Sequence, residues 1–600
     1  MDVEIGGETF HKEPNLLEQI AYRDTWGRGA DSFIAMIYER LILMRDLLAP
    51  DGSIFVHCDW RVQPFIRSTL DEIFGVNRHV NQIEWCYSIG GKGNERFARK
   101  HDTIYFYSKG EKYYFNGKNK DSVVDRKANS HMRLKVDADG RPYQEKTDSK
   151  SGKVYRYYVD EGKIPEDYWT DIEQLNWEDA ERLAYPTQKP EKLLRRIIAA
   201  CTQQDDLIAD FFCGSGTTVA VAEKLGRKWI ATDLGKFGIH TTRKRLIGVQ
   251  RQKKADRQEF RAFEVLNLGR YERAAYLNVG GRLSASQKAQ ALAQKEQDFR
   301  DLILRAYKAT GFGGAEGAQA QDGFFHGARN GRLVVIGPIN LPVGRLFVEE
   351  VITECRKRGA SRVDVLAFEF EMGLFPAVLE EARSKGIDLL PRYIPAQVFD
   401  KRAVDKGQVV FHDISFVEAT PRYEKKNKLA VSIELTDFSV YYSQGAAEAA
   451  IAAMKEGKSE VMCEQGQLYK VSKSKDGIVT KDRLTKHWTD WVDYWAVDFD
   501  YFQRQEIIKV PVGSGLGGIA TLPGFEPPQG ELVLPEFEER WTGGYIFENE
   551  WQSFRTRQNR KLELTTALHT YERAGRYTVA VKVIDIFGND TMTLVPVNVG

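Results

Sequence analysis

The chain has 600 residues, 42% of them hydrophobic and 28% charged, which is typical of a soluble globular protein. One hydrophobic core does not extend over so long a chain, so three or four domains are expected. A formal net charge of +1 does not by itself indicate a nucleic-acid-binding protein, so any affinity for DNA must come from a local patch.

The first hundred residues alternate between helical and β-rich patterns. Apolar side chains at three-to-four spacing predict an amphipathic helix over 31–48, and a Pro-Asp-Gly turn leads into a buried strand over 53–58. A helix near 62–74 and strands near 81–87 and 103–108 follow. The alternation predicts a mostly parallel, doubly wound sheet.

Between residues 109 and 185 the periodicity fades and the polarity rises. Residues 91–160 hold 17 Lys and Arg against 10 Asp and Glu, an excess of seven positive charges in a nearly neutral chain. Aromatic residues are interleaved with them: Tyr113, Tyr114, Phe115, Tyr143, Tyr155, Tyr157 and Tyr158. Cations suit phosphate contacts and the rings could stack on bases. From composition alone, a solvated, loop-rich excursion with a few core tyrosines is the favoured interpretation, and DNA recognition is the alternative.

The stretch at 207–233 predicts a cofactor site. Its pattern is a strand over 207–209, a glycine turn over 210–218, a helix over 219–225 and a second strand that ends at Asp233. A glycine turn lets backbone approach a ligand closely, and a carboxylate one strand later can bind a ribose diol. The turn lacks the Gly-Lys-Ser/Thr ending of a phosphate-binding loop, which argues against a nucleoside triphosphate. The inferred ligand is S-adenosylmethionine.

A second motif, Tyr185-Pro-Thr-Gln-Lys-Pro followed by the helical pattern 191–198, lies just upstream. Together the two motifs resemble the paired cofactor motifs of DNA methyltransferases that modify exocyclic amines, at adenine N6 or cytosine N4. Their order resembles the permuted (beta-type) group that includes type III modification subunits. The resemblance covers about residues 1–250. One departure is Phe211, where the family usually has proline.

The resemblance implies an α/β fold: a doubly wound, S-adenosylmethionine-dependent core over 1–250 with a target-recognition insert at 109–185. It implies that 212–218 wrap the methionine moiety, that Asp233 holds the ribose hydroxyls and that Lys189 is a counter-charge at the carboxylate end. The full set of expected cofactor-binding residues is Asp210, Phe212, Cys213, Gly214, Ser215, Gly216, Thr217, Thr218, Asp233, Thr187, Gln188 and Lys189. Arg96, Arg99 and Lys100 are the candidates for phosphate contacts with double-stranded DNA.

The resemblance also implies a catalytic tetrapeptide, Asp/Asn/Ser-Pro-Pro-aromatic, at the end of a strand. Its side chain and a proline carbonyl would accept hydrogen bonds from the target amine, and the aromatic ring would stack on a flipped base. The sequence does not contain it. The one double proline, in Glu526-Pro-Pro-Gln, has glutamine in the aromatic position and lies about 300 residues beyond the cofactor motifs.

The catalytic residues are therefore unassigned. In the permuted order the tetrapeptide precedes the helix at 31–48 by some tens of residues, which places it upstream of Met1. The expectation is a chain that is truncated at its N-terminus before this motif, and that binds the cofactor weakly and methylates little.

Beyond residue 250 the patterns predict further domains. A helical connector over 251–330, with a helix at 287–308 and a Gly-rich linker at 311–317, precedes a second α/β unit at 331–427. Residues 428–600 are β-rich. The strand at 576–583 alternates, with Tyr577, Val579, Val581 and Val583 on one face, and predicts the last hairpin of an immunoglobulin- or PKD-like module. The glycine-rich stretch 513–518 is taken as a loop, because Pro523 blocks the helix that a dinucleotide site needs.

The remaining expectations concern partners, metals and location. The six cysteines are scattered without a Cys-x-x-Cys pair, and no metal site is expected. The acidic N-terminus and the lack of an apolar run of about twenty residues favour a cytoplasmic protein without a membrane span. A restriction or helicase subunit and a homodimer are open partners. Two rival functions are a non-catalytic DNA-binding scaffold subunit and a small-molecule methyltransferase, the second disfavoured by the motif order and the basic insert.

Overall fold

The computed structural model describes most of the chain. The described residues are 2–5, 8–11, 30–88, 95, 97–126, 132, 134–183, 185, 187–266, 285–312, 324–339, 342–371, 374, 377–399, 404–405, 409, 411–413, 415–440, 454, 456–457, 459–464, 467–474, 478–511, 537–556, 559–586 and 588–600. The chain divides into two compact units, Glu13–Glu264 and a second unit of Asp2–Lys12 with Val265–Gly600. The predicted Gly-rich linker beyond Phe312 and the glycine-rich stretch 513–518 lie outside the described residues.

The first unit begins with helix α2 (Ala30–Leu47) and a four-stranded sheet in the order β3-β5-β4-β9. The elements are β3 (Ser53–Cys58), α3 (Gln63–Phe74), η1 (Val76–Arg78), β4 (His79–Cys86), β5 (His101–Ser108) and β9 (Tyr168–Trp169). One face of the sheet packs on α2 and α3 through a core that includes Leu41, Leu70 and Tyr107. The predicted helices and strands of this region are confirmed.

The prediction of a mostly parallel sheet is wrong for these strands. β5 pairs antiparallel with both β3 and β4, and only β4 and β9 pair in parallel. The reason lies in the connection from β4 to β5, residues 87–100, whose described part holds no helix. A parallel neighbour needs a crossover connection, usually a helix, whereas a chain that returns directly pairs antiparallel.

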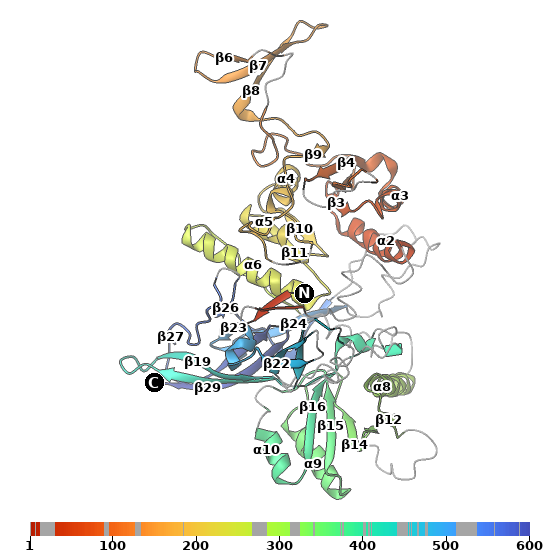
Figure 1. Cartoon of the computed structure of the whole chain (residues 1–600), viewed down its shortest axis with the longest axis vertical. Helices are drawn as coiled ribbons and strands as arrows, with labels where there is room; N and C mark the ends of the chain where they lie inside the picture. The colour runs from red at the N-terminus through yellow and green to blue at the C-terminus, as the bar shows by residue number, and fades with distance from the viewer. Residues whose placement is uncertain are drawn as a thin grey trace. The chain divides into compact units, whose positions relative to one another are not determined.

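The cofactor motifs form a separate α/β element. It comprises α4 (Glu191–Cys201), β10 (Leu207–Asp210), α5 (Thr217–Lys224), β11 (Lys228–Ala231) and α6 (Lys236–Ala255). β10 and β11 pair in parallel, and α5 contacts both strands and packs between α4 and α6 (Figure 1). Among the described strands, β10 pairs only with β11. The predicted strand–turn–helix–strand order is confirmed.

The polar stretch after β5 contains a small sheet of its own. Strands β6 (Leu134–Val136), β7 (Pro142–Thr147) and β8 (Val154–Tyr158) form an antiparallel sheet, followed by η2 (Val159–Glu161) (Figure 1). Tyr143 is buried, and Arg156 lies over its ring at 5.1 Å from the centroid. The interpretation of this stretch as loop-rich is therefore incomplete, because part of it forms a sheet that tyrosine and arginine pairs between strands stabilise.

The second unit contains an α/β sheet in the order β12-β13-β14-β15-β16-β17. Its elements are α8 (Ala285–Tyr307), β12 (Thr310–Gly311), β13 (Gly327–Arg329), β14 (Arg332–Ile336), α9 (Arg345–Lys357), β15 (Arg362–Ala367), α10 (Ala377–Ser384), β16 (Asp388–Tyr393), η3 (Ala396–Phe399) and β17 (His412–Asp413). β14, β15 and β16 run in parallel around a core of valines, which confirms the predicted α/β pattern of this region.

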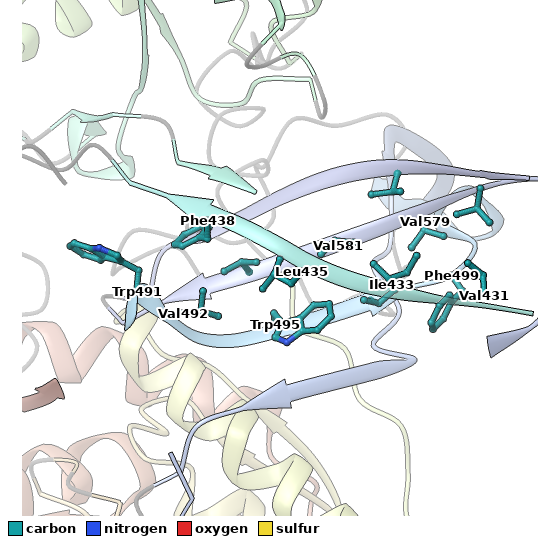
Figure 2. Packing of buried hydrophobic residues seen from close by; sticks show 14 of the residues in the cluster. Val431, Ile433, Leu435, Phe438, Trp491, Val492, Trp495, Phe499, Val579 and Val581 are labelled. Carbon is teal, nitrogen blue, oxygen red and sulfur yellow. The ribbon is translucent and has the colours of Figure 1, made fainter. Parts of the chain in front are cut away.

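The rest of the second unit is β-rich, as predicted. Its elements are β1 (Asp2–Ile5), β2 (Glu8–His11), β18 (Phe416–Tyr423), β19 (Ala430–Ser439), β20 (Ser459–Glu464), β21 (Gln467–Lys473), β22 (Val479–Arg483), η4 (Trp488–Trp491), β23 (Val492–Asp498), η5 (Tyr501–Gln503), β24 (Gln505–Pro511), β25 (Phe537–Tyr545), β26 (Trp551–Phe554), β27 (His569–Thr570), β28 (Gly575–Asp585) and β29 (Asp590–Val599). Figure 2 shows Ile433 and Leu435 of β19 packed with Trp495 of β23 and Val581 of β28. The predicted final hairpin is β28–β29, and Val579, Val581 and Val583 face this core.

Some whole-chain features accompany the fold. Cys58, Cys86, Cys201, Cys213 and Cys355 are free thiols. None of the described helices has the length and apolarity needed to cross a bilayer. Within the described residues, no group of three or more His, Cys, Asp or Glu side chains could hold a metal ion.

The core of the first unit yields a stability prediction. Leu70 of α3 is fully buried, whereas Leu47 at the end of α2 is 72% exposed. Leu70→Ala is expected to lower the free energy of unfolding by about 2–5 kcal/mol, since it leaves a cavity. The matched control Leu47→Ala should change it by less than about 0.5 kcal/mol. Urea titration with hydrogen exchange of the α3 and β5 peptides measures both, and equal effects would contradict this packing.

Candidate active site

A hydrogen bond joins the two cofactor motifs. The hydroxyl of Thr217, the first residue of α5, donates to the backbone carbonyl of Lys189 at 3.1 Å. Lys189 lies just before α4, and α4 packs against α5. The structure therefore brings together the two segments that the sequence analysis assigned to one site.

The glycine turn depends on two left-handed residues. Gly214 has a φ of 49° and Gly216 a φ of 71°, a region that side chains with a Cβ disfavour. A Cβ on Gly216 would lie 2.5 Å from the hydroxyl of Thr242, and one on Gly214 would lie 3.2 Å from the ring of Tyr185. The backbone of the turn is thus packed against two side chains that leave no room for a larger residue.

Asp233 closes the site from the end of β11. Its carboxylate accepts hydrogen bonds from the backbone N–H of Gly214 at 2.8 Å and of Gly235 at 2.7 Å. A Cβ on Gly238 would lie 3.0 Å from the carboxyl carbon of Asp233. The acid therefore lies directly against the glycine turn, as the sequence analysis expected. Gly238 leaves room for this carboxylate, because a side chain there would crowd it.

The other turn residues differ in exposure. Asp210 accepts the backbone N–H of Phe212 at 3.1 Å, and the Phe212 side chain is half exposed. Cys213, Ser215 and Thr217 are buried. Burial raises the pKa of the Cys213 thiol to about 12, so it stays protonated at neutral pH and does not supply a thiolate. Thr218 lies in the first turn of α5.

The segment before α4 is held by its own hydrogen bonds. Thr187 has a φ of 64°, which is unusual for a β-branched residue. The Gln188 side chain accepts from the backbone N–H of Leu183 at 2.8 Å and donates to the carbonyl of Glu181 at 2.7 Å. The ammonium group of Lys189 lies 3.2 Å from the carbonyl of Thr187. Gln188 thus fixes the loop, while Lys189 joins it to α5.

Arg245 of α6 is a site residue that the sequence analysis missed. Its buried guanidinium donates to the hydroxyl of Thr217 at 2.8 Å, the carbonyl of Ser215 at 3.3 Å and the carboxylate of Glu191 at 3.0 Å. Glu191 also pairs with Lys224 at 2.6 Å. Burial raises the pKa of Glu191, but the hydrogen bond from Lys224 and the charge of Arg245 outweigh it, so the net shift is downward. Nothing in the local pattern of α6 distinguishes Arg245 from a solvated arginine.

Tyr185 and Phe237 form a second feature that the sequence analysis did not assign. Their rings stack at 5.5 Å between centroids, with an angle of 6° between planes, and Tyr185 is the ring that a Cβ on Gly214 would meet. The aromatic pair, the glycine turn and the Asp233 carboxylate surround one backbone turn. This donor set fits a nucleoside cofactor, because it offers backbone N–H groups, a carboxylate and apolar ring surface together.

The expected DNA contacts are only partly described. Arg99 lies over the ring of Trp60 at 3.5 Å from the centroid, and both side chains are exposed. The ammonium group of Lys100 donates to the carbonyl of Ser88 at 2.7 Å, so this side chain is held within the fold. Arg96 lies outside the described residues.

The structure does not locate the expected catalytic tetrapeptide. Met1, upstream of which the sequence analysis placed it, lies outside the described residues, and so does the rejected Glu526-Pro-Pro-Gln. The described residues nearest to Met1 are Asp2–Ile5 of β1, which pairs with β2 and is grouped with the second unit rather than with the cofactor motifs. No catalytic residue is therefore assigned from this motif.

The glycine turn yields a prediction with a matched control. Gly216→Ala is expected to lower the free energy of unfolding by at least about 1–2 kcal/mol, because it combines left-handed backbone with a clash against Thr242. Gly248→Ala in the interior of α6 meets no atom within 4 Å and should be neutral or stabilising by up to about 1 kcal/mol. Chemical denaturation of both variants measures the difference, and a stabilising Gly216→Ala would refute the described turn.

The first unit is similar to known DNA methylases. Residues 19–244 match the family profile described as DNA methylase, of the N6/N4 type. The type II methyltransferase M.EcaI of Enterobacter cloacae is 30% identical over 272 residues, which cover 38% of this chain and 59% of that protein. The DNA adenine methyltransferase YhdJ of Escherichia coli (strain K12) is 29% identical over 218 residues, covering 36% of this chain and 67% of YhdJ.

The chain thus spans about three fifths of the length of M.EcaI. Among solved structures, the M1.HpyAVI–SAM complex is similar at 20% identity and a TM-score of 0.23, over 35% of this chain and 80% of that one. A TM-score so low supports no argument about the site. The sequence matches are therefore the relevant likeness: residues 19–244 are similar to DNA methylases of the N6/N4 type.

Proposed function

We propose that the first unit transfers a methyl group from S-adenosylmethionine to an exocyclic amine of a base in DNA, with adenine N6 favoured over cytosine N4. The observation that carries the proposal is the closure of the glycine turn. The Asp233 carboxylate lies 2.8 Å from the backbone N–H of Gly214, and Thr217 lies 3.1 Å from the carbonyl of Lys189. Two successive motifs of the sequence thus meet at one glycine turn, beside an aromatic pair.

Each group of the site has a task in this proposal. When bound, S-adenosylmethionine supplies a methyl group on an already activated sulfonium, so no metal is required. Asp233 would hold the ribose hydroxyls, and residues 212–218 would wrap the methionine moiety. Lys189 would balance the charge of the methionine carboxylate, with Thr187 and Gln188 shaping the loop around it. Arg245 holds the turn through Ser215 and Thr217.

The finer assignment is a permuted, type III-like modification enzyme that acts on specific sites. The motif before α4 precedes the glycine turn in the chain, which supports the permuted order. M.EcaI is named a type II methyltransferase, and we propose by analogy that this chain takes part in a restriction-modification or defence system. Double-stranded DNA would be its substrate, with a restriction or helicase subunit or a second copy as further partners.

The insert at 109–185 would read the DNA sequence. The small sheet β6–β8 carries cations over tyrosine rings, with Arg156 over Tyr143 and Arg141 over Tyr158. Lys118, Lys120, Lys146 and Lys150 are exposed. Cations near rings suit phosphate contacts combined with base stacking. Arg96, Arg99 and Lys100 would add further phosphate contacts.

A second candidate is a non-catalytic DNA-binding scaffold subunit. The sequence lacks the Asp/Asn/Ser-Pro-Pro-aromatic tetrapeptide, which favours it, whereas the closed glycine turn favours the enzyme. The second unit, with its α/β sheet and β-rich part, would serve as a docking or spacing region in either case. The immunoglobulin- or PKD-like character of residues 428–600 stays a prediction.

The cofactor site is tested by Asp233→Ala. Loss of the carboxylate should weaken binding of S-adenosylmethionine by about 10- to 100-fold in calorimetry, since charge-assisted hydrogen bonds contribute about 1.5–3 kcal/mol. Asp148→Ala is the matched control, because Asp148 also accepts two backbone N–H groups, in the turn between β7 and β8. It should leave the affinity unchanged.

Incubation with methyl-labelled S-adenosylmethionine and plasmid DNA then separates the two candidates. The enzyme places label on the DNA, and Asp233→Ala reduces it. A chain that binds DNA without transferring label is the scaffold subunit, and unchanged cofactor affinity of Asp233→Ala contradicts the site itself.

The DNA contact is tested by its salt dependence. Arg99→Ala should reduce the slope of log K against log salt by about 0.9, the contribution of one phosphate. Arg358→Ala is the control, because Arg358 lies over Phe325 at 4.8 Å in the second unit. Fluorescence anisotropy with a labelled duplex measures both slopes. Equal slopes for Arg99→Ala and the unmodified protein would remove Arg99 from the interface.

A further inference from the structure

A buried polar cluster lies on the sheet of the first unit, outside the residues discussed so far. Nε2 of His57 on β3 lies 3.1 Å from a carboxylate oxygen of Asp102 on β5. The hydroxyl of Tyr87, next to the end of β4, donates to the other oxygen of Asp102 at 3.3 Å. The side chains of His57 and Asp102 are 28% and 16% exposed. Neither the cofactor motifs nor the DNA candidates include these three residues.

Strand register explains why the three side chains meet. His57 pairs with Ile104 and Trp85 pairs with Asp102, so His57, Trp85 and Asp102 lie on one face of the sheet. The apolar part of this face packs against Leu193 and Ile197 of α4. The polar cluster therefore lies on the same face of the sheet as the apolar residues that pack against α4.

Lys189 connects the polar cluster to the glycine turn. Its positive charge lowers the pKa of both His57 and Asp102, so it lies within electrostatic range of the pair. Its backbone carbonyl accepts the hydroxyl of Thr217 at 3.1 Å. Lys189 thus accepts a hydrogen bond from the glycine turn through its main chain, and its charge influences the His57–Asp102 pair.

The protonation states of His57 and Asp102 make His57 a suitable proton acceptor. Burial lowers the pKa of His57 below 6.5 and Lys189 lowers it further, while Asp102 and Asp59 oppose the shift. The imidazole is therefore neutral at pH 7. Burial raises the pKa of Asp102, but His57 and Lys189 bring it below its ordinary value, so it is ionised. A carboxylate can only accept, so Nε2 carries the hydrogen and Nδ1 has a free lone pair.

We propose that His57, held in this tautomer by Asp102 and Tyr87, accepts the proton that the target amine loses during methyl transfer. The inference rests on the proposed function. The amine nitrogen forms a bond to the methyl carbon while the carbon–sulfur bond breaks, and the bonding electron pair stays on sulfur. The nitrogen is then cationic, and its N–H proton passes to Nδ1 of His57. The product is a neutral, methylated exocyclic amine of the base, beside a His57 imidazolium that Asp102 stabilises.

The structure explains why a weak base suffices. The cationic nitrogen that methyl transfer leaves on the heteroaromatic ring is strongly acidic, so an acceptor that is neutral at the working pH is enough. Asp102 supplies orientation and charge, and Tyr87 holds the second carboxylate oxygen in place. Burial raises the pKa of Tyr87 to about 12, so it remains a donor. Asp102 and Tyr87 are positioning residues in this proposal.

The test is the pH profile of single-turnover methylation of plasmid DNA by the full chain. The unmodified protein should lose rate as the pH falls through the pKa of His57, below 6.5. His57→Gln should no longer show this acidic limb, the loss of rate at low pH. Its rate should be about 100-fold lower than that of the unmodified protein, and its cofactor affinity should stay within about twofold. Asp102→Asn should shift the limb to lower pH, because the carboxylate that raises the pKa of His57 is gone. His79→Gln, at the far end of β4 and also with a lowered pKa, should keep the limb.

An NMR measurement keeps the test independent of turnover. The ¹⁵N shifts of His57, assigned from their loss in His57→Gln, should show the neutral Nε2–H tautomer at pH 7.5. A protonated ring or the Nδ1–H tautomer overturns the proposal. No label on DNA from the unmodified chain is a failure of the proposed function and removes the inference with it. Label that persists in His57→Gln with an unchanged pH limb overturns the inference alone.

Discussion

The first unit depends on the ion pair between Arg245 of α6 and Glu191 of α4. Arg245 is 6% and Glu191 17% exposed, and the guanidinium also donates to Ser215 and Thr217. A buried ion pair is costly to desolvate, and loss of one partner costs about 3–5 kcal/mol because the other charge stays buried. Such a pair therefore fixes geometry more than it adds stability. Here it ties the start of α4, the glycine turn and α6 into one arrangement.

The position of the glycine turn follows from the Arg245–Glu191 ion pair. Thr217 can donate to the carbonyl of Lys189 only if α4 and α5 begin side by side, and Glu191 and Arg245 hold them there. The same arrangement sets the Asp233 carboxylate against Gly214, since Cys213 and Thr232 are joined by a backbone hydrogen bond at 3.1 Å. The geometry of the glycine turn thus depends on the spacing of three helices as well as on the turn itself.

Sequence patterns predicted most elements of the first unit but not their pairing. The helices at 30–47 and 63–74 and the strands at 53–58, 207–210 and 228–231 follow from local periodicity. The antiparallel pairing of β5 and the small sheet β6–β8 do not, because pairing depends on how a connection returns across the sheet. The tyrosines of the insert were visible as composition, while their stacking under arginines required the register of β7 and β8.

The sequence by itself determined the cofactor motif, since a glycine turn between a strand and a helix and an acid one strand later are local patterns. Residues 185–233 also carry both motifs in order, inside the 19–244 match to the DNA methylase profile. Only the tertiary structure decided that Arg245 supports the turn and that His57 meets Asp102, residues separated by 45 positions. Lone charged or imidazole side chains have no local pattern that names their partner, and burial with strand register supplies it.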